Sequence, residues 1–175
     1  GGDAIFDELV RLLCGILAVD VAMISIYSDG DRARLRTLST HMDGRTLRTF
    51  DYELAGTPCA AMLGRVFRYV RSGAAPECAP GSLFREKGMD SYAAHSLFAP
   101  DGRQLGLIAI MDRDPLPDQA LVETTLKIFA VRVVAELERK IAEQKLRESE
   151  EQYRAIFNAS ADALILWDSK LQRVD

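Results

Sequence analysis

Apolar residues recur at intervals of three and four near the start of the chain, at Ile5, Leu9, Leu12, Leu13, Ile16 and Leu17. This spacing places them on one face and predicts an amphipathic helix over residues 3–18, with Asp3 as its N-cap. Residues 21–27 are rich in β-branched side chains and precede a Ser-Asp-Gly-Asp sequence, which predicts a strand and a turn. Polar and apolar residues then alternate over 33–41, which predicts the return strand of a hairpin with its arginines on the wet face.

Glycine and proline punctuate the middle of the chain. Thr57 followed by Pro58 predicts the N-cap and first position of a short helix over residues 58–63. The flanking turn residues then predict a strand, a loop and one or two helical turns, at residues 66–70, 72–80 and 82–87. The strongest β signal follows, because residues 91–98 and 103–112 flank an Asp-Gly turn.

A long helical pattern begins at Asp118, a natural N-cap, and neither proline nor glycine interrupts it as far as residue 157. One apolar stripe contains Leu126, Val133, Leu137 and Ile141, and a second, offset stripe contains Leu146, Tyr153 and Ile156. The offset predicts a break in the heptad repeat. Residues 136–151 are densely charged with both signs, as on the outside of a coiled coil, so we expect a homodimer through the first stripe of this helix.

The order of elements predicts an α+β fold, with an antiparallel sheet flanked by helices and a long C-terminal helix. Three segments within this order resemble the GAF family: YELAGTPC at 52–59, SYAAHSL at 91–97 and DGRQLGLIAIMD at 101–112. The helix at 128–139 is similar to the last helix of such domains. The resemblance covers residues 5–139 and implies that a small molecule binds between the sheet and the loops spanning roughly residues 54–90.

A second resemblance, to the opening of a PAS domain, is carried by SEEQYRAIFN at 149–158 and ADALI at 161–165. It implies three parts: a GAF-like sensor over residues 3–139, a coiled-coil connector over 140–157, and the truncated start of a PAS-like domain over 158–175. Residues 164–167 are expected to form a strand of that domain. The combination is typical of bacterial histidine kinases and of enzymes that make or degrade cyclic diguanylate.

Composition narrows the classes of function. The chain is 48% apolar and 27% charged, as expected for a globular protein, and its net charge of −4 gives no support for nucleic-acid binding. No apolar run approaches the ~20 residues of a membrane-spanning helix, and no leader is visible, so we expect a cytoplasmic protein without membrane contact in this segment. Three cysteines without CxxC spacing argue against a disulfide framework or a metal site.

Two cysteines invite chemistry. Cys59 lies just inside the predicted helix N-terminus, where the helix dipole lowers a thiol pKa. In some GAF-like proteins a cysteine carries a bilin or reduces methionine sulfoxide, but a bilin site would have a histidine where Ala60 stands. The alternative is a small buried core residue. Cys78 lies in a loop expected to cover the pocket, where it is either an oxidant sensor, if exposed, or an incidental thiol.

Aromatic side chains with polar tips are typical of small-molecule sites. The candidate ligand-binding residues are Cys59, Tyr69, Arg71, Phe84, Tyr92 and His95. Each of them could instead be an ordinary residue of the core or of its rim, without a role in binding. His95 is expected on the strand that floors the pocket, and its distance along the chain from His41, the other histidine, gives no metal-binding pattern.

No catalytic motif appears: the chain lacks a GxSxG, P-loop, HExxH or GGDEF-like sequence. We therefore expect a non-catalytic sensory and dimerising module, whose ligand or cofactor the sequence leaves open, within a parent that is itself an enzyme. One alternative is a cysteine-dependent redox enzyme, such as a free methionine sulfoxide reductase. Another is a dimerisation spacer without a ligand.

Overall fold

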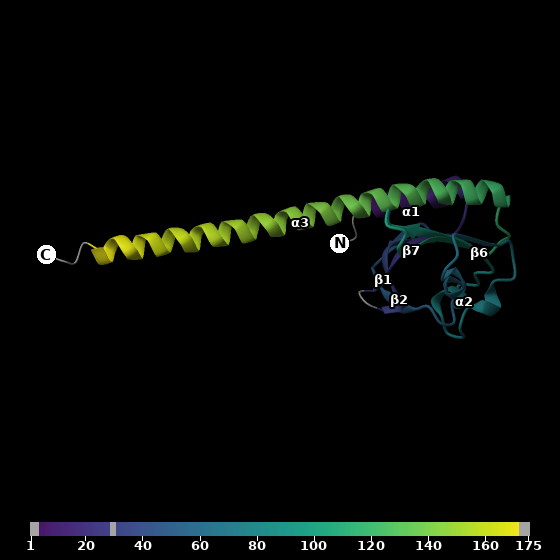
Figure 1. Cartoon of the computed structure of the whole chain (residues 1–175). Helices are drawn as coiled ribbons and strands as arrows, with labels where there is room; N and C mark the ends of the chain where they lie inside the picture. Colours follow the sequence, from purple (N-terminus) through teal and green to yellow (C-terminus); the bar gives the residue numbers. More distant parts are fainter. Residues whose placement is uncertain (1–3, 29–30, 172–175) are drawn as a thin grey trace. The chain divides into compact units, whose positions relative to one another are not determined.

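A computed structural model of the chain describes residues 4–28 and 31–171, with the side chains of residue 83 and residues 161–171 left out. The chain divides into two compact units, Gly1–Val134 and Ala135–Asp175. The first unit is an antiparallel sheet with helices and short turns on its two faces, and the second unit is helical (Figure 1). The predicted fold class is confirmed.

The sheet has the strand order β3-β2-β1-β7-β6-β5, with β4 paired to β2. All of its neighbouring strands run antiparallel. The strands are β1 (Val21–Ser28), β2 (Asp31–Met42), β3 (Arg45–Leu47), β4 (Asp51–Glu53), β5 (Phe67–Val70), β6 (Ser91–Phe98) and β7 (Gln104–Asp112). The two predicted hairpins, β1–β2 and β6–β7, are confirmed, whereas β3 and β4 were missed because three-residue strands carry almost no periodic signal.

Two helices cover one face of the sheet, and α2 (Leu83–Glu86) lies on the other (Figure 1). The first of them, α1 (Ala4–Leu17), buries Phe6, Val10, Leu13 and Leu17 at three- and four-residue spacing. The predicted face is only partly right, because Leu12 and Ile16 are 39% and 57% exposed. Asp7 on the same helix accepts a hydrogen bond of 2.5 Å from the hydroxyl of Ser39 on β2. The predicted helix is thus confirmed, although its predicted cap at Asp3 lies outside the described residues.

The long helix α3 (Gln119–Leu171) begins where the sequence predicts. The carboxylate of Asp118 accepts hydrogen bonds from the backbone N–H groups of Ala120 and Leu121, at 3.0 and 3.2 Å, and so caps the first turn. Within the first unit the helix buries a stripe that contains Val122, Leu126, Ala130 and Val133. In the same unit, the large apolar side chains of Leu121, Ile128 and Val131 on this helix are exposed.

The strand expected at residues 164–167 is not present, because α3 continues as a helix through these residues to Leu171. A single strand without a partner leaves its backbone groups unpaired, whereas a helix satisfies them within the segment. The uninterrupted run without proline or glycine favours the same outcome.

Gly106 on β7 is required by the close approach of β1. A Cβ atom built at this position would lie 2.0 Å from the carbonyl oxygen of Ser25 and 2.7 Å from the Cα of Ile26. Both neighbouring atoms belong to the backbone and cannot rotate away. The glycine therefore fixes how closely β7 packs beside Ser25, where the β1–β2 register also shifts.

Candidate functional site

The face of the sheet opposite α1 carries a sulfur-rich core. All five methionines of the chain lie in it, together with Cys59 and Cys78. Its other buried members are Val21, Leu35, Leu54, Ala74, Phe84, Tyr92, Ala94, Leu107 and Ala109. This core, which we call the loop-side core, lies between the sheet and the loops of residues 54–89. Methionine is flexible and polarisable, so a core of this kind repacks more readily than one of branched side chains.

Strand alternation brings polar groups to the same face. Successive side chains of a strand point to opposite faces. On β1, Val21 and Met23 belong to the loop-side core, which places Ser25 and Tyr27 on this face as well. Tyr27 is half-buried and packs against the core. On this face of β1, the apolar side chains of Val21 and Met23 are therefore followed by the hydroxyl-bearing side chains of Ser25 and Tyr27.

Tyr52 on β4 connects this half of β1 to Cys59. Its hydroxyl lies 3.2 Å from the Ser25 Oγ and 3.7 Å from the Cys59 Sγ, within hydrogen-bond distance of both. Burial raises the pKa of Tyr52 well above its usual range, so its hydroxyl stays protonated and available as a donor. β4 was not predicted, and this contact therefore had no signal in the sequence.

Cys59 stands at the centre of the site and carries a neutral thiol. It is 1% exposed and lies on η1 (Pro58–Met62), a 3₁₀ helix of five residues. Burial raises the pKa of Cys59, and the side chains of Tyr92, Tyr52 and Thr57 only partly oppose this. The predicted lowering by a helix dipole is wrong, because desolvation outweighs the dipole of so short a helix.

The expected cap of that helix is also absent. Thr57 precedes Pro58 as predicted, but its hydroxyl makes no capping bond to η1 and instead donates to the carbonyl of Leu54 at 2.8 Å. This bond tightens the turn before the helix. The backbone N–H of Ala79 donates to the carbonyl of Gly56, at 2.7 Å, and ties the same turn to the loop that carries Cys78.

Two tyrosine hydroxyls in this region are buried and have no hydrogen-bond partner, those of Tyr27 and Tyr92. Tyr92, on β6, is fully buried, and burial followed by the neighbouring Cys59 raises its pKa well above the usual range. Its hydroxyl lies beside the Cys59 thiol but does not meet hydrogen-bond geometry. Burial, opposed by Arg32, also raises the pKa of Tyr27. We call Tyr27, Tyr52 and Tyr92 the tyrosine cluster.

Arg68 on β5 closes one side of the site. Its guanidinium carbon lies 5.7 Å from the centre of the Tyr92 ring. The same guanidinium donates to both carboxylate oxygens of Glu77, at 2.8 and 2.6 Å, and to the carbonyl of Pro58, at 3.3 Å. Glu77 belongs to η2 (Ala75–Glu77) and Pro58 begins η1. One arginine thus fastens two loop segments beside the tyrosine cluster.

Three of the six predicted ligand-binding residues, Cys59, Phe84 and Tyr92, meet in the loop-side core. His95 and Tyr69 lie at strand positions that alternate with members of this core, and they are not part of it. The His95 Nδ1 lies 2.8 Å from the carbonyl of Ser96, and the Tyr69 hydroxyl donates to the carbonyl of Pro117 at 2.6 Å. Arg71 is exposed.

Cys78 is not the exposed loop thiol that an oxidant sensor would need. It is 4% exposed, and its pKa is raised, first by burial and then by the neighbouring Cys59 and Glu77. Sequence reasoning also missed Arg68, Glu77 and Tyr52. Only the two-residue spacing of Arg68 and Val70 along β5 could have suggested that this arginine shares the face of Val70, which packs against the core.

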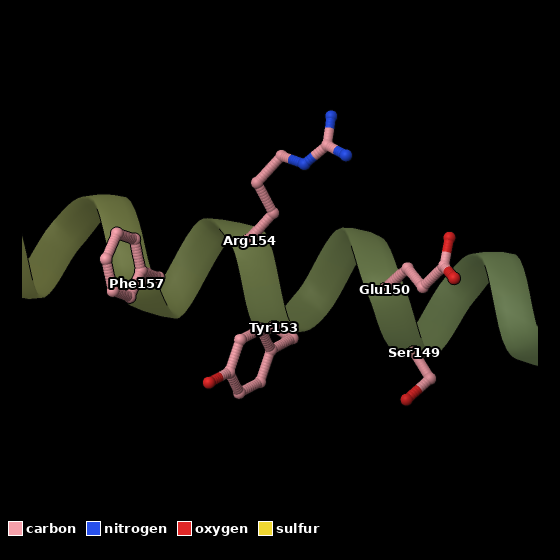
Figure 2. Close-up of a pocket in the computed structure, with 5 residues that line it drawn as sticks. All are labelled: Ser149, Glu150, Tyr153, Arg154 and Phe157. Carbon is pink, nitrogen blue, oxygen red and sulfur yellow. The ribbon is translucent and has the colours of Figure 1, made fainter.

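Two surface hollows lie away from this core. Tyr69 and Arg71 line one of about 430 Å³, beside the start of α3. The other is an open stretch of the α3 surface beside Ser149, Glu150, Tyr153, Arg154 and Phe157. Figure 2 shows that these five side chains leave a single helix in different directions, with Tyr153 and Arg154 on opposite sides. They do not converge on a ligand, because one helix cannot enclose a volume.

Across the described ranges 4–28 and 31–171, no three histidine, cysteine or acidic side chains are grouped so that they could hold a metal ion. In the same part of the chain, no helix is both long and apolar enough to cross a membrane.

Comparison with known proteins points to one family. The model of the GAF domain family matches residues 2–137. A search of curated proteins finds no match. Among solved structures, the GAF domain of an Acinetobacter phosphoenolpyruvate-protein phosphotransferase superposes with a TM-score of 0.59 at 12% identity, over 80% of this chain and 84% of that one.

Two further structures share the fold. The chromophore-binding domain of a bacteriophytochrome from R. palustris has a TM-score of 0.58 at 12% identity. The alignment covers 76% of this chain but only 54% of the bacteriophytochrome chain. A type II free methionine-R-sulfoxide reductase from Thermoplasma acidophilum has a TM-score of 0.58 at 12% identity, over 74% of this chain and 86% of that one. At such identities the likeness concerns the fold alone.

Proposed function

Because the chain belongs to the GAF domain family, we propose that it is the sensory and dimerising module of a bacterial signal-transduction protein, in which a ligand held by the loop-side core acts on the long helix. GAF domains are generally sensory and non-catalytic. The parent protein in this proposal is a histidine kinase or an enzyme of cyclic-diguanylate turnover, and the segment after the connector is the start of a PAS-like domain.

The observation that carries the proposal is the continuity of α3. The helix buries Val122, Leu126 and Val133 within the first unit, and it continues without a break to Leu171. An element that is both part of a sensor core and the path out of it is the kind of element whose position a ligand can bias. Such a ligand must bind two conformations with different affinity, since otherwise it shifts nothing.

A second copy of the chain is the proposed partner of the helix. Along the described part of the second unit, the exposed large apolar side chains are those of Ile141, Leu146, Tyr153, Ile156 and Phe157. Charged residues of both signs surround them, and Arg139 pairs with Glu136 and Glu143 along the helix. Apolar side chains that are at least half exposed on a charged helix are typical of a coiled-coil seam before pairing.

The seam differs from the stripe that the sequence suggested. Leu126 and Val133 are fully buried within their own unit, Leu137 is half-buried and Ile141 is 50% exposed. We therefore propose that pairing relies on the second stripe, where Leu146, Tyr153 and Phe157 lie on one face of the helix and are exposed. Leu126 and Val133 serve the core of the protomer in this proposal.

The experiment that tests the proposal is native mass spectrometry of the purified chain, compared with its denatured mass. A dimer that carries an additional small-molecule mass supports the sensor function. A dimer without additional mass removes the ligand and leaves a dimerisation spacer. A monomer without additional mass overturns the proposal.

A cysteine-dependent reductase is the competing function, and the presence of Cys59 and Cys78 in one core is the observation that favours it. Against it, both thiols are buried and both pKa values are raised by burial, whereas a catalytic cysteine needs an accessible thiolate. Turnover of free methionine sulfoxide with a thiol reductant, lost on Cys59→Ser, would favour the reductase over the sensor.

A further inference from the structure

The tyrosine cluster contains more hydrogen-bonding capacity than the protein itself uses. The hydroxyls of Tyr27 and Tyr92 are buried without a partner, whereas the third hydroxyl, of Tyr52, reaches Ser25 and Cys59. Each unpaired buried hydroxyl costs on the order of 1–3 kcal/mol. A phenylalanine at either position would fill the same space without this cost, so the two hydroxyls require an explanation.

The charges around the two hydroxyls determine which kind of ligand can bind to them. Among its described members, the loop-side core contains no charged side chain. The raised pKa values of Cys59, Tyr52 and Tyr92 keep these groups neutral and protonated at neutral pH. Two guanidinium groups reach the cluster: that of Arg68 lies over the ring of Tyr92, and that of the exposed Arg32 lies over the ring of Tyr27. Arg68 is the more buried of the two.

The arginine is also placed to change partners. The Arg68 side chain is 17% exposed and that of Glu77 is 35% exposed, so the carboxylate of Glu77 lies nearer to solvent than the guanidinium it binds. If Glu77 moves outward with its loop, the positive charge of Arg68 is left beside Tyr92, whose buried hydroxyl also has no partner. An anion fits that set of donors, whereas a cation would meet like charge.

The side chains around the tyrosine cluster determine what kind of group the rest of the ligand can be. Methionine thioethers, Leu35, Leu54 and Phe84 form an apolar lining with flexible members. These residues are buried in the closed protein, so a ligand enters only when the loops carrying η1 and η2 open. The apparent affinity is then reduced by the fraction of molecules that are open, which couples binding to a conformational change.

We propose that Tyr92 and Arg68 form the polar end of a site for a small apolar carboxylate, whose carboxylate accepts from the Tyr92 hydroxyl and from the Arg68 guanidinium in place of Glu77. This inference rests on the proposed sensory function and names the chemical class of its ligand. Binding separates Arg68 from Glu77 and therefore holds the loops of η1 and η2 in a different position.

The test is a titration of the full chain with benzoate and hexanoate, each paired with its neutral amide, followed by saturation-transfer NMR. Concentrations of up to about 10 mM detect binding free energies of only a few kcal/mol. We expect both carboxylates to bind and the amides to bind at least fivefold more weakly. Benzylamine, a cation of similar size, should not compete with benzoate.

Tyr92→Phe is the decisive variant, because it removes one hydroxyl and keeps the ring. We expect it to raise the Kd for benzoate at least fivefold while the protein stays folded. Tyr69→Phe is the matched control, since its hydroxyl binds the carbonyl of Pro117 outside the loop-side core, and it should leave the Kd unchanged. Absence of carboxylate binding, or equal binding by the Tyr92→Phe variant, would overturn the inference.

Failure of this inference is distinguishable from failure of the sensory function. If native mass spectrometry finds a neutral or cationic bound molecule and the carboxylates do not bind, the ligand class is wrong and the sensor proposal stands. If the chain is a monomer without additional mass and the carboxylates bind through Tyr92, the site stands and the dimeric signalling proposal falls.

Discussion

Both Nη atoms of Arg68 donate to the carboxylate of Glu77, at 2.8 and 2.6 Å, and this pair joins β5 to the η2 turn beside Tyr92. The Arg68 side chain is largely buried, unlike the arginines of the exposed ion pairs on this protein. Hydrogen bonding to Glu77 raises the pKa of Arg68, so the guanidinium stays charged throughout the accessible pH range. The pair is therefore a candidate latch on the loops that cover the site.

Breaking this latch should loosen two separate loops. Glu77→Gln removes the charge and keeps the shape, and we expect it to lower the free energy of unfolding by about 1 kcal/mol. Hydrogen exchange of the backbone amides of η1 and η2 should become faster. The control is Asp51→Asn, which breaks the exposed pair with Arg36 and should leave exchange in these loops unchanged. Equal exchange in the Glu77→Gln variant and the wild type would show that the pair does not hold the loops.

Replacing tyrosine by phenylalanine should lower the stability of the protein at Tyr52 but not at Tyr92. Tyr52→Phe removes a hydroxyl that serves Ser25 and Cys59, and we expect it to destabilise the protein by about 1–2 kcal/mol. Tyr92→Phe removes an unpaired hydroxyl and should be neutral or stabilise by up to about 1 kcal/mol without ligand. Urea unfolding measures both. A loss of stability in the Tyr92→Phe variant would mean that its hydroxyl has a partner.

The effect of a glycine-to-alanine substitution on stability should also depend on its position: it should destabilise the protein at Gly106 and stabilise it at Gly15. In Gly106→Ala the new Cβ meets the backbone of Ser25 at 2.0 Å, so the strands must separate, and we expect a loss of at least about 3 kcal/mol. Gly15→Ala is the matched control, because this residue lies within α1 and its Cβ meets nothing within 4 Å. It should stabilise the protein by about 0.5–1 kcal/mol through helix propensity. Thermal unfolding of the two variants tests the pair.

Stability should fall in alkaline solution, in part because of Cys14. Burial, followed by Asp20 and Asp112, raises the pKa of Cys14 from 9.0 to about 12. A thiol whose pKa is raised on folding contributes stability that is present in full below the unfolded pKa and is lost as pH rises toward the folded pKa. Between pH 8 and 10 the wild type should therefore lose up to about 1.4 kcal/mol more than Cys14→Ala. Parallel pH profiles for the two proteins would contradict this.

Dimerisation should depend on the exposed seam of α3. Leu146 is 62% exposed, and in Leu146→Glu we expect a charge at the seam to weaken pairing at least tenfold, because it would be desolvated between two helices. Light scattering over a range of concentrations measures the dissociation constant. Lys145→Glu changes the charge by two units at the neighbouring position, against one unit in Leu146→Glu; it is the control and should weaken pairing less. An unchanged mass in Leu146→Glu would place the partner elsewhere.

Local patterns in the sequence determined most of the fold. The spacing of Ile5, Leu9 and Leu13 specified α1, the Asp-Gly turn at 101–102 specified the β6–β7 hairpin, and Asp118 specified the start of α3. Each signal lies within a few residues of the element that it defines, because helix faces, tight turns and caps depend on neighbouring residues. Two of the three motifs of the family resemblance lie on the β6–β7 hairpin, whereas the motif at 52–59 runs from β4 to η1.

The site was decided only by the tertiary structure. Tyr52 reaches Ser25, 27 residues away in the sequence, because β4 pairs with β2 and β2 pairs with β1. Cys59 is only seven residues from Tyr52, but their contact depends on how the turn between β4 and η1 folds back on the sheet. Burial then reversed the expected direction of the Cys59 pKa, because desolvation depends on everything packed around the thiol. The sequence could likewise show that Leu126 and Ile141 share a stripe, but packing alone determined that Leu126 faces its own core while Ile141 remains half exposed.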